Sequence, residues 1–479
     1  MKISVWTKET DIPQRAELNE NIETEVAVVG AGLAGILIAE RLQSAGKKVV
    51  VLEACRIASG QTKNTTAKIT AQHGCVYSDF VDTFGFEKTK IYAEENLRAV
   101  EWYRKYIIEN SIQCDFETKK AYIYSIYDEE KIKKEVDVCA RLGMPVSFNY
   151  KTDLPFKIAG AVEMDAQAQF NPLKFIKEVS KKLTIYENTP VIRVEGNTLY
   201  CENAKVTAKH VIFACHFPFV NFPGLYFARM HQQRSYVLAL KNAANFKGMY
   251  IGVDSVGFSF RNYGDLLLLG GAQHRAGENT DGGQYDLLRQ RAKQWFPKSE
   301  EAACWSAQDC VTLDGMPYIG RFTKNNPDWY VATGFGKWGM TNSCVSASVL
   351  TDLICKNENS AIDVFSPSRF SAKAAGSLAN EVYHSAKGLI KQIVCIPQNK
   401  LKDIPIGGAG AVLLDGKKVG VYRESEDKYH CVKLRCPHLG CRLEWNPEEK
   451  SWDCPCHGSR FDYKGNLIDN PSQKNIKTV

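Results

Sequence analysis

The segment Val26-Ala-Val-Val-Gly30-Ala-Gly32-Leu-Ala-Gly35 places a short apolar strand directly before three glycines. A second apolar strand, Lys48-Val-Val-Val-Leu52, ends at Glu53, about 20 residues further on. Glycines at this spacing allow a tight turn and the close approach of a pyrophosphate, which the free N–H groups at the start of a helix attract. A carboxylate at the end of the second strand accepts hydrogen bonds from ribose hydroxyls and repels a 2′-phosphate, so this site disfavours NADP. The predicted contacts of a bound dinucleotide are Gly30, Gly32, Leu33, Ala34, Gly35 and Glu53.

A second glycine-rich segment, Gly334-Phe-Gly336-Lys-Trp-Gly339, follows the predicted strand Trp329-Tyr-Val-Ala-Thr333 and precedes a predicted helix. It could form a separate NAD site, but no second βαβ unit and no strand-end acid follow it. We therefore expect the positive end of this helix to face the same cofactor. The predicted contacts are Gly334, Gly336, Gly339, Met340 and Thr341.

The composition is that of a globular protein with two or three domains, since the chain has 479 residues, 44% of them apolar and 24% charged. Its 61 basic and 54 acidic residues are interspersed, which argues against nucleic acid binding. The sequence contains no run of about 18 apolar residues, so we expect no membrane span. The first ten residues have no apolar signal core, so we expect a cytoplasmic protein whose 16 cysteines are mostly reduced.

The C-terminal part carries two short motifs, Cys436-Pro-His438 and Cys454-Pro-Cys456-His457. A Rieske [2Fe–2S] centre needs two thiolates on one iron and two imidazoles on the other, and each motif supplies one of each. A Cys2His2 zinc site uses the same ligand types, but zinc fingers usually pair the cysteines in one motif and the histidines in the other. The predicted cluster ligands are therefore Cys436, His438, Cys454 and His457, with zinc as the alternative.

This stretch resembles the Rieske family, and the resemblance implies three further features. Cys441 and Cys456 match a disulfide between the two cluster loops, which local burial can protect in a reducing cytosol. Ser459 matches a serine that bonds a cluster sulfide. Phe461 stands where the high-potential members have a tyrosine, so a hydrogen bond that raises the potential is missing. We expect a potential below the top of the Rieske range of roughly −150 to +300 mV.

Residues from about 22 to 355 resemble the FAD-dependent family of D-amino-acid, glycine and sarcosine oxidases. The resemblance rests on the glycine segment with Glu53, on Val211-Ile-Phe-Ala-Cys-His216, and on Leu313-Asp-Gly-Met-Pro-Tyr-Ile-Gly320 with the strand and glycines that follow. It implies FAD as the cofactor and a loop, 60–68, that covers it, although threonines and a lysine replace the family's usual serine and arginine there. The further FAD contacts that it implies are Thr62, Thr65, Thr66, Lys68, Val191, Asp314 and Gly315.

The predicted fold class is an α/β FAD-binding domain of the glutathione-reductase-like Rossmann type, a β-rich substrate domain, and an all-β Rieske domain. We place the first unit at 1–390 and the Rieske domain at 391–479, where Asp415-Gly416 between two apolar runs predicts a hairpin. The predicted FAD-binding segments are about 22–75, 185–220 and 306–355, and the substrate-domain segments are about 76–184 and 221–305.

The resemblance implies hydride transfer to FAD from a carbon that bears an amine, in an amine or amino-acid-like small molecule. Because a [2Fe–2S] cluster carries one electron, we expect the electrons to leave FAD singly, through the cluster, for an external one-electron carrier or a quinone-like acceptor. A guanidinium or a tyrosine often holds the substrate carboxylate in such enzymes. The candidate substrate contacts are Arg234, Tyr236, Arg261 and His274.

Two other functions stay open. Electrons could enter through the cluster and the flavin could reduce a substrate, or the chain could be a non-enzymatic redox sensor or electron-carrier subunit. A Rieske oxygenase is rejected, because such enzymes need two histidines and a carboxylate around a mononuclear iron. Of the nine histidines, two are assigned to the cluster and the others show no suitable spacing.

Overall fold

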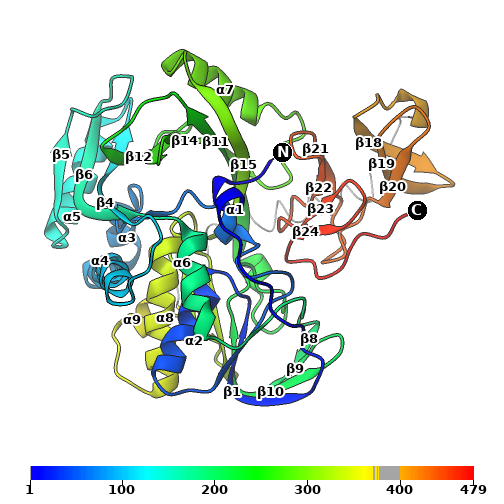
Figure 1. Cartoon of the computed structure of the whole chain (residues 1–479), viewed down its shortest axis with the longest axis horizontal. Coiled ribbons are helices and arrows are strands. Elements are labelled where there is room, and N and C mark those ends of the chain that lie inside the picture. Colours follow the sequence, from blue (N-terminus) through cyan, green and yellow to red (C-terminus); the bar gives the residue numbers. More distant parts are fainter. Residues whose placement is uncertain (1, 370–372, 375, 377–399) are drawn as a thin grey trace.

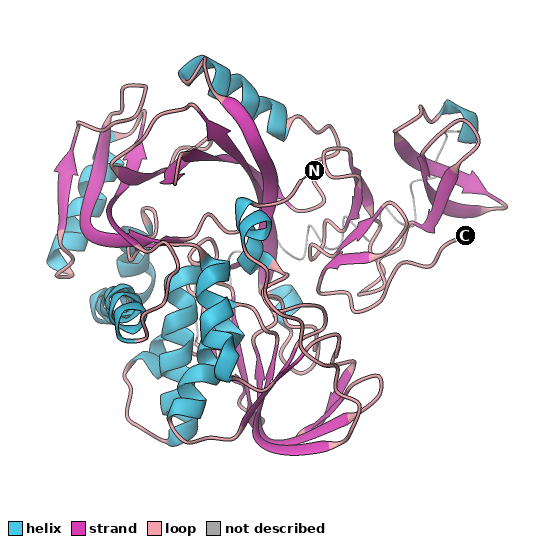
Figure 2. Cartoon of the chain, in the orientation of Figure 1, coloured by secondary structure: helices cyan, strands magenta, loops and turns pink. Residues whose placement is uncertain are grey.

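The computed structural model of the chain describes residues 2–369, 373–374, 376 and 400–479. It contains a mostly parallel sheet with helices, a large mixed sheet, and a C-terminal unit at the right of Figure 1 that consists almost entirely of strands and loops (Figure 2). The expected domain boundary near residue 390 lies outside the described residues. No helix among the described residues combines the length and the apolar character that crossing a membrane requires.

The first sheet is built around the predicted βαβ unit, with the strand order β16-β17-β10-β1-β2-β7, and β9 and β8 extend it beside β10. Neighbours from β17 to β7 run parallel. Their near-continuous apolar residues suit a sheet that is covered on both faces. The strands are β1 (Ile22–Val29), β2 (Val49–Leu52), β7 (Ile185–Tyr186), β8 (Arg193–Glu195), β9 (Thr198–Tyr200), β10 (Lys205–Phe213), β16 (Tyr318–Thr323) and β17 (Asn326–Thr333).

Helices α2 and α8 pack against each other on one side of this sheet (Figure 2). Each begins within one of the two glycine-rich segments, so both helix starts lie at the same edge, where the parallel strands end. The helices of this half are α1 (Val5–Glu9), α2 (Leu33–Ser44), α6 (Pro172–Val179), α8 (Gly339–Cys355) and α9 (Ala361–Phe365).

The second sheet has nine strands in the order β15-β11-β14-β13-β12-β4-β6-β3, with β5 beside β6. Its strands are β3 (Lys68–Ile69), β4 (Glu117–Ser125), β5 (Val146–Asn149), β6 (Gly160–Gln169), β11 (Met230–Lys241), β12 (Gly248–Gly252), β13 (Ser259–Tyr263), β14 (Leu266–Arg275) and β15 (Glu300–Thr312). The helices that accompany it are α3 (Val76–Phe84), α4 (Phe86–Glu109), α5 (Glu129–Arg141) and α7 (Gln284–Trp295).

The C-terminal unit contains a three-stranded and a four-stranded antiparallel sheet. The predicted hairpin is confirmed, because Asp415 and Gly416 form its turn with φ values of 45° and 71°, as a tight hairpin turn requires. The strands are β18 (Ala409–Leu414), β19 (Lys417–Arg423), β20 (Tyr429–Lys433), β21 (Glu444–Asn446), β22 (Ser451–Asp453), β23 (Arg460–Asp462) and β24 (Leu467–Asp469). The predicted architecture of an α/β part, a β-rich part and an all-β C-terminal part is thus confirmed.

Candidate functional site

A cavity of about 680 Å³ lies where the two large sheets and the C-terminal unit meet. Both glycine-rich segments, the ends of β1, β2 and β10, and strands β11 and β15 border it, and residues 467–475 of the C-terminal unit close one side. The volume suits a large cofactor together with a small substrate.

The glycine segment after β1 brings strand and helix into direct contact. A Cβ atom at Gly35 would lie 1.9 Å from the carbonyl oxygen of Gly30, and one at Gly30 would lie 2.7 Å from that of Ala214. Glu53 accepts hydrogen bonds from the backbone N–H of Ala31 (2.7 Å) and of Cys55 (2.9 Å), and burial raises the pKa of its carboxyl group. This geometry holds a carboxylate beside the start of α2, where a dinucleotide ribose would lie.

The predicted covering loop is fixed from two sides. The Thr62 hydroxyl accepts a hydrogen bond from the N–H of Leu33 (3.0 Å), at the start of α2. Arg261 is fully buried and donates to the carbonyl oxygens of Thr66 (2.8 Å) and Ala67 (2.9 Å). Arg261 therefore holds the backbone of the loop in place. Its guanidinium is used for these bonds, so the structure does not favour the prediction that it contacts the substrate.

Most of the predicted FAD contacts border the cavity, namely Gly30, Gly32, Leu33, Ala34, Glu53, Thr62, Thr65, Thr66, Lys68, Val191, Gly334, Gly336, Gly339 and Met340. Lys68 lies next to Thr66, and burial, with a smaller effect from the charge of Arg261, lowers the pKa of its amine to about 7. Gly35 serves the strand–helix contact instead.

Besides Gly35, three predicted contacts do not border the cavity. Asp314 forms a buried ion pair with Arg369 (2.7 Å) and, with Gly315, shapes the turn after β15. Thr341 is buried in the first turn of α8, where its hydroxyl lies 3.0 Å from Nε2 of His73. His73 in turn stacks on Trp338, which borders the cavity. These residues stabilise the elements around the cavity without bordering it themselves.

Arg234 and His274, two of the predicted substrate contacts, do not border the cavity. Arg234 is buried and bonds Gln308 (3.1 Å) and Ser306, and its guanidinium pairs with Glu449 of the C-terminal unit. Tyr236 borders the cavity, but its hydroxyl lies 3.0 Å from His274 Nε2. Because His274 Nδ1 donates to the Arg275 carbonyl (2.7 Å), Nε2 accepts this bond from the tyrosine.

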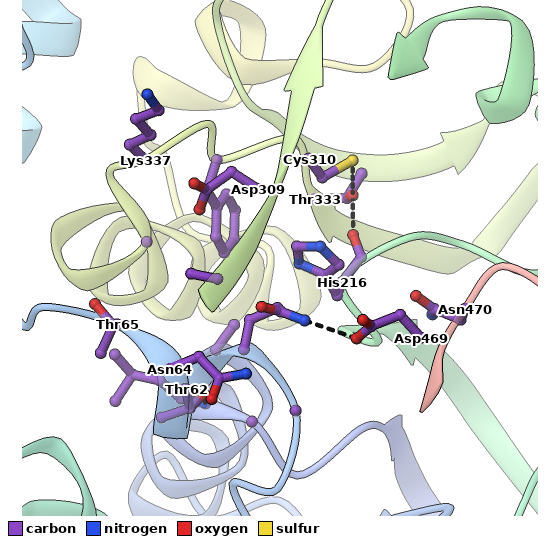
Figure 3. Close-up of a pocket in the computed structure, with 18 of the residues that line it drawn as sticks. Thr62, Asn64, Thr65, His216, Asp309, Cys310, Thr333, Lys337, Asp469 and Asn470 are labelled. Carbon is purple, nitrogen blue, oxygen red and sulfur yellow. Dashed lines mark hydrogen bonds between the residues drawn. The ribbon is translucent and has the colours of Figure 1, made fainter. Parts of the chain in front are cut away.

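The charged side chains that do border the cavity from β15 and from the turn before α8 are Asp309 and Lys337 (Figure 3). Burial raises the pKa of Asp309 to about 6, although the charges of Lys337 and Arg234 oppose this rise. Lys337 is exposed, and its Nζ bonds the side chain of Gln273, which also borders the cavity. Among the described residues that border the cavity there is no arginine. Sequence reasoning missed both residues: Asp309 belongs to no quoted motif, and Lys337 lies inside the second glycine-rich segment, where only the glycines and the helix start were considered.

The cluster motifs come together at the end of the C-terminal unit. Cys436 and Cys454 are buried, and the rings of His438 and His457 stand perpendicular with centroids 5.0 Å apart. The Cys454 thiol and the backbone N–H groups of His438 and Leu439 lower the pKa of Cys436, whereas the bond with Cys436 and burial raise the pKa of Cys454. Nδ1 of His438 is buried and has no hydrogen-bond partner among the described residues. Two thiols and two imidazoles in this arrangement fit a Rieske cluster.

Residues around these ligands also agree with the Rieske pattern. A disulfide joins Cys441 to Cys456 and so links the two loops. Phe461 is fully buried, and the Ser459 hydroxyl accepts a bond from the N–H of Ser472 (2.9 Å).

The cluster end of this unit docks on the rest of the chain. Gln232 of β11 donates to the carbonyl of His457 (2.7 Å), and Gln308 of β15 donates to that of Gly458 (2.8 Å). Asn470 donates to the carbonyls of Cys215 (2.7 Å) and Phe217 (2.9 Å), beside the cavity (Figure 3). The wall of the cavity and the cluster loops are therefore parts of one interface.

One segment, residues 214–229, reaches both places, and we call it the bridging segment. Ala214, Cys215 and His216 border the cavity. Further along, Asn221 accepts a hydrogen bond from His438 (2.7 Å), and the ring of Phe227 stands perpendicular to that of His457 at 5.6 Å.

Comparison with known proteins agrees with this division. Residues 25–353 match the family of FAD dependent oxidoreductases, and residues 394–479 match the Rieske [2Fe-2S] domain. The chain is 34% identical, over 99% of its length and 97% of the relative's, to YhfW of Bacillus subtilis (strain 168), which is named as a Rieske 2Fe-2S iron-sulfur protein.

Two solved structures share the fold of the larger half. Glycine oxidase from Geobacillus kaustophilus has 17% identity and a TM-score of 0.60, with 73% of this chain and 99% of that one covered. L-proline dehydrogenase from P. horikoshii has 18% identity and a TM-score of 0.61, with 73% and 98% covered. The chain thus belongs to the FAD dependent oxidoreductase family and carries a C-terminal Rieske [2Fe-2S] domain, so that it is an oxidoreductase with FAD and a [2Fe–2S] cluster as cofactors.

Proposed function

We propose that this oxidoreductase is a dehydrogenase that oxidises an amine or amino-acid-like small molecule and sends the electrons singly through the cluster to an external acceptor. The observation that carries this proposal is the bridging segment. Its first residues border the cavity, and its Asn221 and Phe227 contact the two cluster histidines. A single short piece of chain thus connects the proposed sites of hydride removal and electron exit.

The cofactor contacts follow from the cavity. We propose that the two glycine-rich segments and Glu53 hold FAD, and that Cys436, His438, Cys454 and His457 hold the cluster. When bound, FAD supplies a hydride acceptor and the cluster supplies a one-electron carrier. Residues of the loop 60–68 and of 467–475 line the cavity, and with FAD bound they would shield the space between the sheets from water.

We propose that Asp309 and Lys337 handle the substrate. A carboxylate whose pKa is raised to about 6 can accept the proton of a substrate ammonium group at neutral pH, which leaves the amine neutral for oxidation. A lysine in the same cavity can attract a substrate carboxylate or carbonyl. The names of the two structural neighbours, a glycine oxidase and an L-proline dehydrogenase, agree with an amino-acid-like substrate.

The test is anaerobic stopped-flow spectroscopy of the complete protein with a panel of amino acids and amines. We expect some member of the panel to bleach the flavin and the cluster signal to change afterwards. The matched control is Cys454→Ser, which removes one proposed cluster ligand: its flavin should still bleach, but a one-electron acceptor should no longer be reduced. A flavin that is fully reduced while the wild-type cluster stays oxidised would refute the relay.

A further inference from the structure

A side chain outside the cluster domain contacts one of the cluster ligands. His438 Nε2 lies 2.7 Å from Oδ1 of Asn221, which belongs to the bridging segment, 217 residues earlier in the chain. The other ring nitrogen, Nδ1, is buried and lacks a hydrogen-bond partner among the described residues, so it is the nitrogen left to bind iron. Nε2 then carries the proton and donates to the Asn221 oxygen.

This bond differs from the other polar contacts of the interface. Gln232 and Gln308 bond backbone carbonyls of the cluster loop and so hold the loop in place. Asn221 instead bonds the ring of a ligand. An acceptor on the outer nitrogen of a metal-bound histidine fixes the orientation of the ring and makes it a stronger electron donor to the metal.

We propose that Asn221 is a positioning residue that orients the His438 ring and lowers the reduction potential of the cluster. The oxidised cluster with two thiolates and two neutral imidazoles has no net charge, and the added electron makes it negative. The negative end of the Asn221 amide dipole therefore favours the oxidised form, and so does a more basic imidazole. Both effects have the same sign, and both are lost when the oxygen is removed.

The proposal rests on the assignment of His438 as a cluster ligand, but not on any substrate. A chemical redox titration measures the potential without amine turnover, so a failure of the proposed dehydrogenase activity leaves this test intact.

The experiment is a redox titration of the complete protein, followed by electron paramagnetic resonance of the reduced cluster. Asn221→Leu keeps the size of the side chain and removes the acceptor, and Asn221→Asp keeps the acceptor and adds negative charge. We expect the ratio of reduced to oxidised cluster, at a fixed ambient potential, to rise about threefold to tenfold in Asn221→Leu, which corresponds to about 28 to 59 mV upward. Asn221→Asp should shift the potential downward.

The matched control is Asn203→Leu, because Asn203 is exposed and bonds Glu17 on the surface (2.9 Å). Its potential should equal that of the wild type. The hyperfine coupling of one histidine nitrogen should change in Asn221→Leu and stay unchanged in the control. If Asn221→Leu does not assemble the cluster, the direction in which Asn221→Asp shifts the reduction potential still tests the proposal.

Unchanged potentials in both Asn221 variants, or shifts of the same sign in both, would overturn the proposal. A wild-type spectrum without couplings to two histidine nitrogens would remove the assignment of His438 and, with it, the role of Asn221.

Discussion

Glu449 links the C-terminal unit to the rest of the chain through a buried ionic cluster. The structure allows an estimate of how much this carboxylate contributes to the free energy of unfolding. Its carboxylate contacts Arg234 of β11 and Arg460 of β23, and all three side chains are at most 10% exposed. Burial alone would raise the pKa of Glu449, but the two guanidinium groups lower it to about 2. Relative to the ordinary value of 4.5, this corresponds to about 3 kcal/mol of stabilisation at neutral pH.

We predict that Arg234→Met lowers the free energy of unfolding by about 2 kcal/mol. Removing one partner of a buried ion pair typically costs about 3 to 5 kcal/mol, because the other charge is left uncompensated. Here Arg460 stays beside Glu449, so the loss is smaller. Glu449→Gln should cost a similar amount, and the double variant should cost clearly less than the sum of the two, because both single changes remove the same interaction.

The assay is denaturation of the complete protein, followed by the visible circular dichroism of the cluster, for the wild type, both single variants and the double variant. The pH dependence provides a second check. Since the pKa of Glu449 is lower in the folded protein, its contribution is complete above about pH 4.5 and is lost as the pH falls through about 2. The coupling between Arg234 and Glu449 should therefore shrink in acid. Strictly additive costs at neutral pH would refute the ionic explanation.

Three further predictions concern single sites. Cys441→Ser should destabilise the cluster-binding loops by about 3 kcal/mol, the value for a closed loop of 15 residues, and thermal loss of cluster absorbance measures it; a variant as stable as the wild type would contradict the role of the disulfide. Asp309→Asn should remove a rise in the rate of flavin reduction as the pH increases through about 6, because the carboxylate is the active form; a pH profile that the substitution leaves unchanged would exclude Asp309 as the base. Phe461→Tyr should raise the potential of the cluster, since a tyrosine hydroxyl restores a hydrogen bond to it, and an unchanged midpoint in a redox titration would count against this explanation.

The parts of the fold that the sequence predicted are those in which the signal is local. Gly30 and Gly35 belong to one strand–turn–helix unit, and the contact between them is made within six residues. The turn at Asp415 and Gly416 likewise depends only on the conformations that these two residues allow. The cluster motifs are equally short, so their ligand types and spacing carried the Rieske assignment.

The roles of Arg234 and Asp314 could not be predicted in this way, because their partners lie far from them in the sequence. Arg234 matched the chemistry of a carboxylate-binding residue, but its partner Glu449 lies 215 residues away and in another domain. Asp314 looked like part of a flavin motif, whereas its carboxylate pairs with Arg369. Neither partner is marked by any pattern near the arginine or the aspartate, so the sequence left both roles open.

The close packing of the interface supports the proposed internal relay over an independent electron carrier. A Cβ atom at Gly458 would lie 2.8 Å from the side chain of Gln232, and one at Gly277 would lie 2.4 Å from the backbone of Pro455. Backbone that approaches so closely on two sides of the cluster loop leaves no room for a water layer, so this end of the domain is packed like a protein interior. A shuttling carrier needs its cluster ligands free to meet a partner. Here the bridging segment contacts both histidine rings, and the loops that carry them bond strands that border the cavity, so a proposed cluster would be held in place rather than free to shuttle.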